Sequence, residues 1–283
     1  MLSVDQLEDE LLELAFAEDI GDGDHTTLCC IPEDAMGKSH LLVKEEGILA
    51  GVALARKVFD KFDPSMQMEV FIEDGAHVKP GDIAFVVTGK TRSLLQTERI
   101  MLNIMQRMSG IATMTNKYVK LLEGTGCHVL DTRKTTPGLR MIEKQAVKIG
   151  GGMNHRIGLF DMILLKDNHI DFAGGIENAI DRCHEYLQKK GLDIKIEIEV
   201  RDFDELNRVL TKGGVHRVML DNFSVADTKK AVDLINHRLE VESSGGITYD
   251  TIRGYAEQGV DFISVGALTH SVKGLDMSFK ACD

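Results

Sequence analysis

The chain has 283 residues, enough for one large domain or two ordinary ones. It carries 45 acidic and 33 basic side chains, and this net charge of −12 argues against a nucleic-acid partner, which needs a basic face. A hydrophobic fraction of 43% excludes a mostly disordered protein, and no apolar run approaches the length of a membrane helix. Five cysteines without a C-x-x-C pair, and an acidic start without a secretory signal, favour a cytoplasmic protein with reduced thiols.

The first half of the chain mixes helical and strand patterns. Apolar residues at helical spacing predict a helix from Met1 to about Ala17, and another over Val52–Phe62. Four strands are predicted, at Ser39–Val43, Gly47–Ala50, Met66–Ile72 and Ile83–Thr88. A long helical pattern follows from Ser93 to Glu123, in which Gly110 is a possible break between two helices.

The second half repeats a strand-then-helix unit. Six strands are predicted, at Cys127–Asp131, Met162–Leu165, Ile194–Val200, Arg217–Leu220, Arg238–Glu242 and Phe262–Val265. Helical patterns fill gaps between them, at Gly175–Lys190, Phe203–Thr211, Ala226–His237 and Tyr249–Gln258. Repeated units of this kind indicate a parallel sheet, and their number and spacing favour an α/β barrel over an open sheet.

Polar residues stand at the end of almost every predicted strand of the second half. They include Asp131–Lys134, Lys166–His169, Asp221–Asn222, Glu242–Gly246 and Ser264–Gly266. A single polar residue after a strand is usually a helix cap, but a succession of them indicates a site. In a barrel the carboxyl ends of the strands converge on one rim, where these side chains would meet.

Positive charge is concentrated near this predicted rim. The segment Asp131–Ile170 holds seven basic and four acidic residues, a net charge of +3 in an acidic chain. The pattern indicates a small anionic ligand, because Arg pairs with carboxylates or phosphates and Lys acts as a point charge. Arg140, Lys144 and Lys148 are spaced about four residues apart, which is equally typical of an exposed helix face.

Two glycine-containing turns close the repeat, at Ser243–Gly246 and Ser264–Ala267. Turns after the last strands of an α/β barrel often bind phosphate through backbone amides, so we expect a phosphate site there. A third glycine run, Gly150–Gly152, is interpreted as a flexible link that lets His155 and Arg156 reach the site.

Carboxylates complete the predicted rim. Strand alternation places Glu197 and Glu199 on one face, and Asp221 ends the next strand. Such groups can bind ribose hydroxyls or hold Mg²⁺ together with phosphate oxygens. Because a charged pair inside a barrel is unfavourable without partners, the pattern favours a role for these residues in the site.

With these motifs in place, the chain resembles the quinolinate phosphoribosyltransferase family, also called nicotinate-nucleotide pyrophosphorylase (carboxylating). The resemblance extends over nearly the whole chain and rests on Glu18–Asp24, Glu98-Arg99, Thr132–Gly138, His155-Arg156, Lys166–His169, Glu197, Glu199, Leu220–Asn222, Ser244–Ile247 and Ser264–Gly266. It implies an N-terminal α/β sandwich domain, residues 1–112, with a tail at about 268–283 that packs back on it. It also implies an incomplete, open α/β barrel over residues 113–267, and a homodimer in which each site is completed by the partner.

The resemblance implies a reaction as well: transfer of the 5-phosphoribosyl group from phosphoribosyl pyrophosphate to quinolinate, with release of pyrophosphate and CO₂. The product would be nicotinate mononucleotide, an NAD precursor. The cofactor would be Mg²⁺. The implied catalytic residues are Lys134, Lys166, Glu199 and Asp221. The implied substrate-binding residues are Thr132, Arg133, Lys134, His155, Arg156, Lys166, Glu199 and Asp221, with Arg99 supplied across the dimer. Glu199 and Asp221 would also face the metal, and the implied phosphate-binding residues are Ser244, Gly245, Gly246, Ser264, Val265 and Gly266.

Two other functions remain compatible with parts of the sequence. A non-catalytic protein could use the same rim to bind phosphorylated ligands without turnover. The turn-rich segment Glu73–Asp82 is also typical of biotinyl or lipoyl carrier domains, although Gln67 lies between Met66 and Met68, where a carrier presents its Lys.

Overall fold

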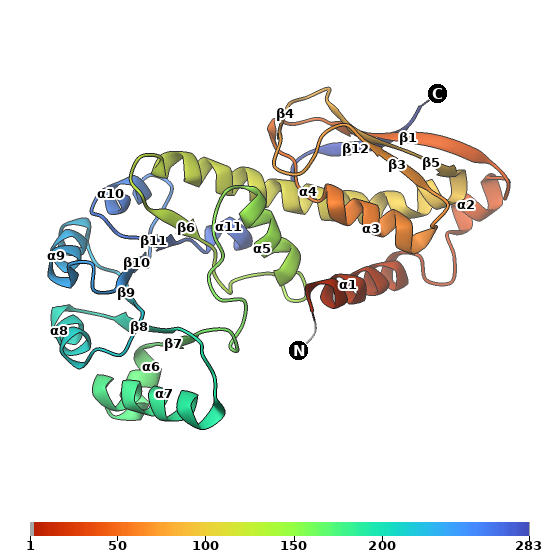
Figure 1. The fold of residues 1–283 in the computed structure, drawn as a ribbon. Coiled ribbons are helices and arrows are strands. Elements are labelled where there is room, and N and C mark those ends of the chain that lie inside the picture. Colours follow the sequence, from red (N-terminus) through yellow and green to blue (C-terminus); the bar gives the residue numbers. More distant parts are fainter. Residues whose placement is uncertain (1–2, 283) are drawn as a thin grey trace. The chain divides into compact units, whose positions relative to one another are not determined.

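The computed structural model describes residues 3–282 and divides into two compact units (Figure 1). The first unit holds the chain up to Asn116, together with Thr135–Gly151 and the chain from Ala267 onward. The second holds Lys117–Lys134 and Gly152–Gly266. No helix among the described residues is long and apolar enough to cross a membrane. The predicted domain boundaries, 1–112 and 113–267, rest on the resemblance and stay a prediction.

The first unit is built on a four-stranded antiparallel sheet with the order β12-β1-β5-β3. Its strands are β1 (Met36–Val43), β3 (Gln67–Val70), β5 (Ile83–Lys90) and β12 (Met277–Ala281), and a small pair is formed by β2 (Gly47–Ile48) and β4 (His77–Val78). Its helices are α1 (Val4–Asp19), α2 (His25–Cys30), α3 (Val52–Phe62), the first part of α4 (Thr91–Leu122), α5 (Arg140–Ile149) and α11 (Ala267–His270).

Helix α3 packs on this sheet through aromatic side chains, and α3 and α4 lie along the same side of it in Figure 1. Phe59 of α3 contacts Phe85 of β5 and Phe279 of β12, with ring centroids 6.2 and 6.1 Å apart. These three buried rings tie the middle of the sheet, its C-terminal edge strand and the covering helix into one core. The α/β sandwich expected for the N-terminal half is confirmed.

Helix α4 corrects the sequence-based interpretation of Gly110, because it runs unbroken through this residue. A Cβ atom at this position would lie 2.3 Å from the carbonyl oxygen of Lys273. The glycine therefore lets the returning C-terminal chain cross the helix closely and does not end it. From the sequence alone, a glycine within a helical pattern indicates either a helix break or a close approach by another segment. The two cases could not be told apart at Gly110.

The second unit contains six parallel strands in the order β6-β11-β10-β9-β8-β7. They are β6 (His128–Leu130), β7 (Ile163–Leu165), β8 (Ile196–Val200), β9 (Arg217–Asp221), β10 (Glu240–Ser244) and β11 (Phe262–Ser264). The helices are α6 (Asp167–Ala173), α7 (Ile176–Lys190), α8 (Phe203–Lys212), α9 (Val225–Ile235) and α10 (Ile252–Ala256). Among the described residues no ladder joins β6 to β7, so the predicted incomplete, open α/β barrel is confirmed.

Contacts on both sides hold the glycine run Gly150–Gly152 in place, which corrects its interpretation as a flexible link. Gly150 is buried and caps the C-terminus of α5. Immediately after the run, Met153 forms a parallel bridge with Leu130 at the edge of β6. The segment that leads to His155 and Arg156 is thus held beside the sheet by backbone hydrogen bonds.

Candidate active site

A cavity of about 330 Å³ opens at the carboxyl ends of the strands in the second unit. Its walls are Thr132, Arg133, Lys134, His155, Arg156, Leu164, Lys166, Met219, Glu242, Ser244 and Ser264. Most of these residues stand at or just after the carboxyl ends of different strands, far apart in the sequence. The predicted convergence of strand ends on one rim is therefore confirmed. Eight of the predicted site residues lie here: Thr132, Arg133, Lys134, His155, Arg156, Lys166, Ser244 and Ser264.

The walls are rich in cations. Arg133, Lys134 and Lys166 are exposed, and Arg156 is half-buried with Nη1 donating to the carbonyl of Met162 at 3.3 Å. Burial and the nearby charge of Arg133 lower the pKa of Arg156. Cations that oppose one another in this way favour the binding of an anion between them.

Local hydrogen bonds fix the chain that carries these cations. The backbone N–H of Lys134 donates to the hydroxyl of Thr132 at 3.0 Å, which closes a turn directly after β6. Asp131, fully buried at the end of this strand, accepts from the backbone N–H of His155 at 2.9 Å. Asp131 therefore joins the two segments that supply the cations.

The floor of the cavity is a buried network of charges. His155, only 8% exposed, places Nε2 3.1 Å from Oε2 of Glu197 and 3.4 Å from Oε2 of Glu242. Both carboxylates are fully buried, and Arg217 places Nη1 3.3 Å from Oε2 of Glu242. The predicted placement of Glu197 on the rim is therefore wrong, because its side chain points into the barrel and pairs with His155.

Burial and ionic contacts compete in this network. Burial alone would lower the pKa of His155, but its contacts with Glu197 and Glu242 raise this pKa to about 9. The backbone N–H of Arg156 donates to Nδ1 at 2.7 Å and favours a neutral ring instead. In both protonation states Nε2 carries a proton and lies close to the two carboxylates.

The two carboxylates differ from each other. Burial and the adjacent charge of Glu242 raise the pKa of Glu197 to about 7. Burial would also raise the pKa of Glu242, but hydrogen bonds from His155 and Ser264 and the charge of Arg217 outweigh it and lower this pKa. Glu242 is therefore the carboxylate that stays ionised.

Glu199 and Asp221, the predicted metal-facing pair, lie beside the cavity without lining it. Glu199 accepts from Nζ of Lys166 at 2.8 Å, and Asp221 ends β9 with Oδ2 bound to the amide of Asn222 at 2.8 Å. Glu199 pairs with Met219 in the strand register, and Asp221 lies two residues beyond Met219. Both carboxylates thus share the face of the sheet on which Met219 borders the cavity.

This arrangement fits Mg²⁺, which binds one or two carboxylates and completes its shell with water and substrate phosphate oxygens. His155, Glu197 and Glu242 also lie close enough to form a metal site, with ligand atoms within 4.8 Å of one another. There His155 and Arg217 already contact the carboxylates of Glu197 and Glu242. The buried cluster is therefore a poorer magnesium site than Glu199 and Asp221.

The predicted phosphate-binding turns follow β10 and β11. Gly245 adopts φ +94°, and a Cβ there would lie 2.2 Å from Oδ1 of Asn222, so a side chain would block the close approach of the two strand ends. Gly245, Gly246, Val265 and Gly266 do not line the cavity, and the N–H of Val265 donates to the carbonyl of Leu130 at 2.9 Å. The phosphate-binding roles of these turns stay predictions.

Arg99, predicted to act across a dimer, is exposed on α4 in the first unit. The sequence interpretation assigned no site role to Met219 or Arg217, and it named Glu242 only among the polar strand ends expected on the rim. The signal for Arg217 and Glu242 was charge inside short apolar strands, which is unfavourable unless the charges are paired.

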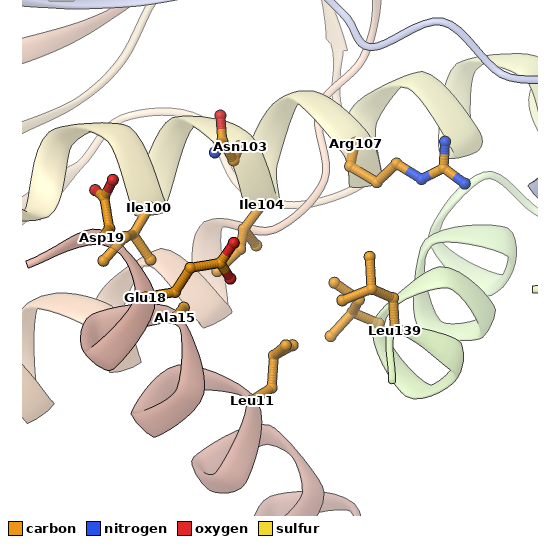
Figure 2. Close-up of a pocket in the computed structure, with 10 residues that line it drawn as sticks. Leu11, Ala15, Glu18, Asp19, Ile100, Asn103, Ile104, Arg107 and Leu139 are labelled. Atoms are coloured by element: carbon orange, nitrogen blue, oxygen red, sulfur yellow. The ribbon is translucent and has the colours of Figure 1, made fainter. Parts of the chain in front are cut away.

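The first unit has a cavity of its own, of about 300 Å³, between α1, α4 and α5 (Figure 2). Its lining is mostly aliphatic: Leu11, Ala15, Ile100, Ile104, Leu139 and Ile142, with Glu18, Asp19, Asn103 and Arg107 as the polar members. Arg107 is engaged by the fully buried Glu143 at 2.7 Å and by the carbonyl of Thr269 at 2.6 Å. Arg107, the one cation among the residues that line this cavity, therefore stabilises the fold.

Comparison with known proteins matches two family models that together span most of the chain. Residues 24–109 match the family model for the quinolinate phosphoribosyl transferase N-terminal domain, and residues 111–280 match that for its C-terminal domain. The match over 24–109 covers the segment that suggested a carrier domain, and that alternative is set aside.

Relatives agree with this match along the chain. A tobacco (Nicotiana tabacum) protein named quinolinate phosphoribosyltransferase (decarboxylating) 1b is 46% identical over 285 residues, covering 95% of this chain and 81% of the relative. The probable nicotinate-nucleotide pyrophosphorylase (carboxylating) of Bacillus subtilis is 39% identical over 269 residues, covering 95% of this chain and 91% of the relative. The structure of the Francisella tularensis nicotinate-nucleotide pyrophosphorylase superposes with a TM-score of 0.92 at 39% identity, covering 100% of this chain and 98% of that one.

Proposed function

Because this chain belongs to the quinolinate phosphoribosyl transferase family, we propose that it transfers the 5-phosphoribosyl group of phosphoribosyl pyrophosphate to quinolinate and releases pyrophosphate and CO₂. The product is nicotinate mononucleotide, so the enzyme is a pentosyltransferase of NAD biosynthesis. The observation that carries the proposal is the cavity of the second unit, where Arg133, Lys134, Arg156 and Lys166 surround a space at the strand ends.

The substrate side of the proposal follows from charge. Quinolinate carries two adjacent carboxylates, and removing such a dianion from water is unfavourable unless fixed cations surround it. Arg offers a planar guanidinium and Lys a compact ammonium. Arg133 and Arg156 supply forks for carboxylates, and Lys134 and Lys166 supply point charges. The hydroxyl of Thr132 closes the turn that carries Arg133 and Lys134.

The chemical step needs stabilisation of charge at the ribose. As the pyridine nitrogen attacks C1 of the ribose, pyrophosphate leaves and the sugar becomes oxocarbenium-like. Glu199 and Asp221 stabilise the positive sugar, and Lys134 and Lys166 offset negative charge on the substrates. When bound, Mg²⁺ neutralises the pyrophosphate oxygens, and Glu199 and Asp221 are the residues that would hold it.

The loss of CO₂ follows from the first step. Once its nitrogen is bonded to ribose, the pyridine ring is cationic and accepts the electron pair left when the 2-carboxylate departs. The ring then takes up a proton at that carbon. No covalent nucleophile on the protein is required for either step, so the proposed mechanism assigns that role to no serine or cysteine.

Release of CO₂ tests the function directly. Purified protein given quinolinate, phosphoribosyl pyrophosphate and Mg²⁺ should release CO₂ and pyrophosphate in equal amounts, and EDTA should stop the reaction until Mg²⁺ is restored. If the folded protein is stabilised by both substrates but releases no CO₂, it is the non-catalytic binder that the sequence also allowed.

We also propose a homodimer with shared sites, in which Arg99 of one protomer serves the cavity of its partner. The exposure of Arg99 on α4 supports this proposal. Mixing and reassociating Arg99→Ala with Lys166→Ala protomers should restore about a quarter of wild-type activity, because half of the dimers are hybrids with one intact site. Verified hybrids without activity would exclude sharing. The cytoplasmic location expected from the sequence stays a prediction, which cell fractionation would test.

A further inference from the structure

Glu242 lines the cavity between His155 on one side and Ser264 on the other. Its carboxylate lies 3.4 Å from Nε2 of His155. Ser264 lies two residues beyond the strand partner of Glu242, lines the same cavity, and its hydroxyl helps to lower the pKa of Glu242. Arg217 holds the same carboxylate from β9 with Nη1 at 3.3 Å. These partners come from three separate stretches of chain, and the Glu242 side chain is fully buried between them.

Each contact leads to a different part of the site. On one side, His155 accepts the backbone N–H of Arg156 through Nδ1 at 2.7 Å, so fixing its ring also fixes the chain that carries the Arg156 guanidinium. On the other side, Ser264 ends β11 and begins a turn that the family resemblance predicts to bind phosphate. A single carboxylate thus sets the orientation of groups on both sides.

A structural role alone explains this arrangement poorly. Replacing a buried ion pair by apolar residues of similar volume is often neutral or stabilising. The neighbouring strand positions Val241 and Ile263 are filled in that apolar way. Glu197 also contacts His155, but it does not line the cavity, whereas Glu242 and Ser264 both do.

We propose that Glu242 is a positioning residue that couples the quinolinate side of the cavity to its phosphoribosyl side. Its buried carboxylate orients His155 with Arg156, and Ser264, at the same time. This inference rests on the proposed function, and its test separates the two. A wild-type protein without transferase activity contradicts the proposed function, whereas the outcomes below concern Glu242 alone.

The first test is Glu242→Gln, which keeps the side-chain volume and removes the charge. We expect KM for quinolinate and KM for phosphoribosyl pyrophosphate each to rise about tenfold, with a smaller change in kcat, because a misplaced site binds both substrates less well. The matched control is Glu240→Gln on the same strand: Glu240 also contacts Arg217, with Oε2 3.0 Å from Nη2, but does not line the cavity. Both KM values of the control should stay at wild-type level.

Double-mutant cycles provide the second test, in a protein that retains Glu242. Ser264→Ala and His155→Gln change two groups that border the cavity on either side of Glu242. If Glu242 couples them, their effects on KM should depart from additivity by about threefold or more. Glu242→Asp, which keeps the charge but shortens the reach, should raise both KM values and serves if Glu242→Gln does not fold.

Three outcomes would overturn the inference. The first is a Glu242 variant that loses thermal stability while both KM values stay unchanged, which indicates a structural role. The second is a rise in KM for one substrate only. The third is strict additivity of the Ser264 and His155 substitutions.

Discussion

The two units each contain a cavity of similar volume, about 300 and 330 Å³, and the two cavities differ in chemistry. In the first unit aliphatic side chains form most of the walls, and its cation, Arg107, is held by Glu143 and Thr269. In the second unit cations line the opening, and the buried carboxylates lie beneath them. Volume therefore does not distinguish a site from a gap in packing, whereas charge directed at an open space does.

The largest effect should come from removing a cation of the second cavity. Lys166→Ala should lower kcat/KM by about a thousandfold, because the substrates lose a charge that acts inside the site. The side chain of Lys166 is 47% exposed, so the melting temperature should stay close to that of the wild type. Steady-state kinetics and a thermal melt check both statements, and near-normal turnover would contradict the assigned role.

Replacing the cation of the first cavity should affect stability instead. Arg107→Met should lower the free energy of unfolding by about 3 kcal/mol, because Glu143 is left buried without its ionic partner. Denaturant unfolding measures this loss. Asn103→Ala, in the same cavity, is the mild control, and both variants should keep the wild-type KM values. A selective rise in KM for either substrate would show that the first cavity takes part in binding.

A dicarboxylate without a ring nitrogen sharpens the comparison through binding alone. Phthalate presents the two adjacent carboxylates of quinolinate but cannot attack ribose. At a hundred times its dissociation constant it should stabilise the protein by about 2.7 kcal/mol. Arg133→Ala should abolish most of this stabilisation, and Asn103→Ala should leave it intact. Calorimetry with the two variants makes the comparison directly.

The smallest effect concerns the thiols, which differ between the units in accessibility. Cys29 and Cys30 of the first unit are exposed, whereas burial raises the pKa of Cys127 in the second unit to about 12. At pH 8 Cys127 therefore stays protonated, and an alkylating reagent should label Cys29 and Cys30 first. Peptide mapping by mass spectrometry gives the order, and rapid labelling of Cys127 in folded protein would contradict its burial.

Much of the second unit was predictable because its strands are short apolar runs that end in polar residues. Periodicity located β6 to β11 within a few residues, and the strand ends identified seven wall residues of the cavity: Thr132, Arg133, Lys134, Lys166, Glu242, Ser244 and Ser264. Interior pairing was not predictable, because alternation shows that Glu197 and Glu199 share a face but not that the face at Glu197 is occupied by His155. The same limit applies to Lys144, which has the spacing of an exposed helix charge but is fully buried.

The first unit was less predictable because its contacts join residues far apart in sequence. The spacing around Val52–Phe62 located α3 at the observed bounds, since an amphipathic helix carries its own signal. Strand β12 was expected only as a tail that packs back, because five residues near the chain end carry little periodicity. Its pairing with β1 is a long-range property that no local pattern encodes.

That pairing has a consequence for biosynthesis. The edge of the first sheet is supplied by Met277–Ala281, about 240 residues after β1 begins. A ribosome makes the other three strands early, but the sheet stays one strand short until Ala281 has been translated. Until then the edge of β1 is open to other chains, so a nascent chain stalled before β12 is the form most exposed to aggregation.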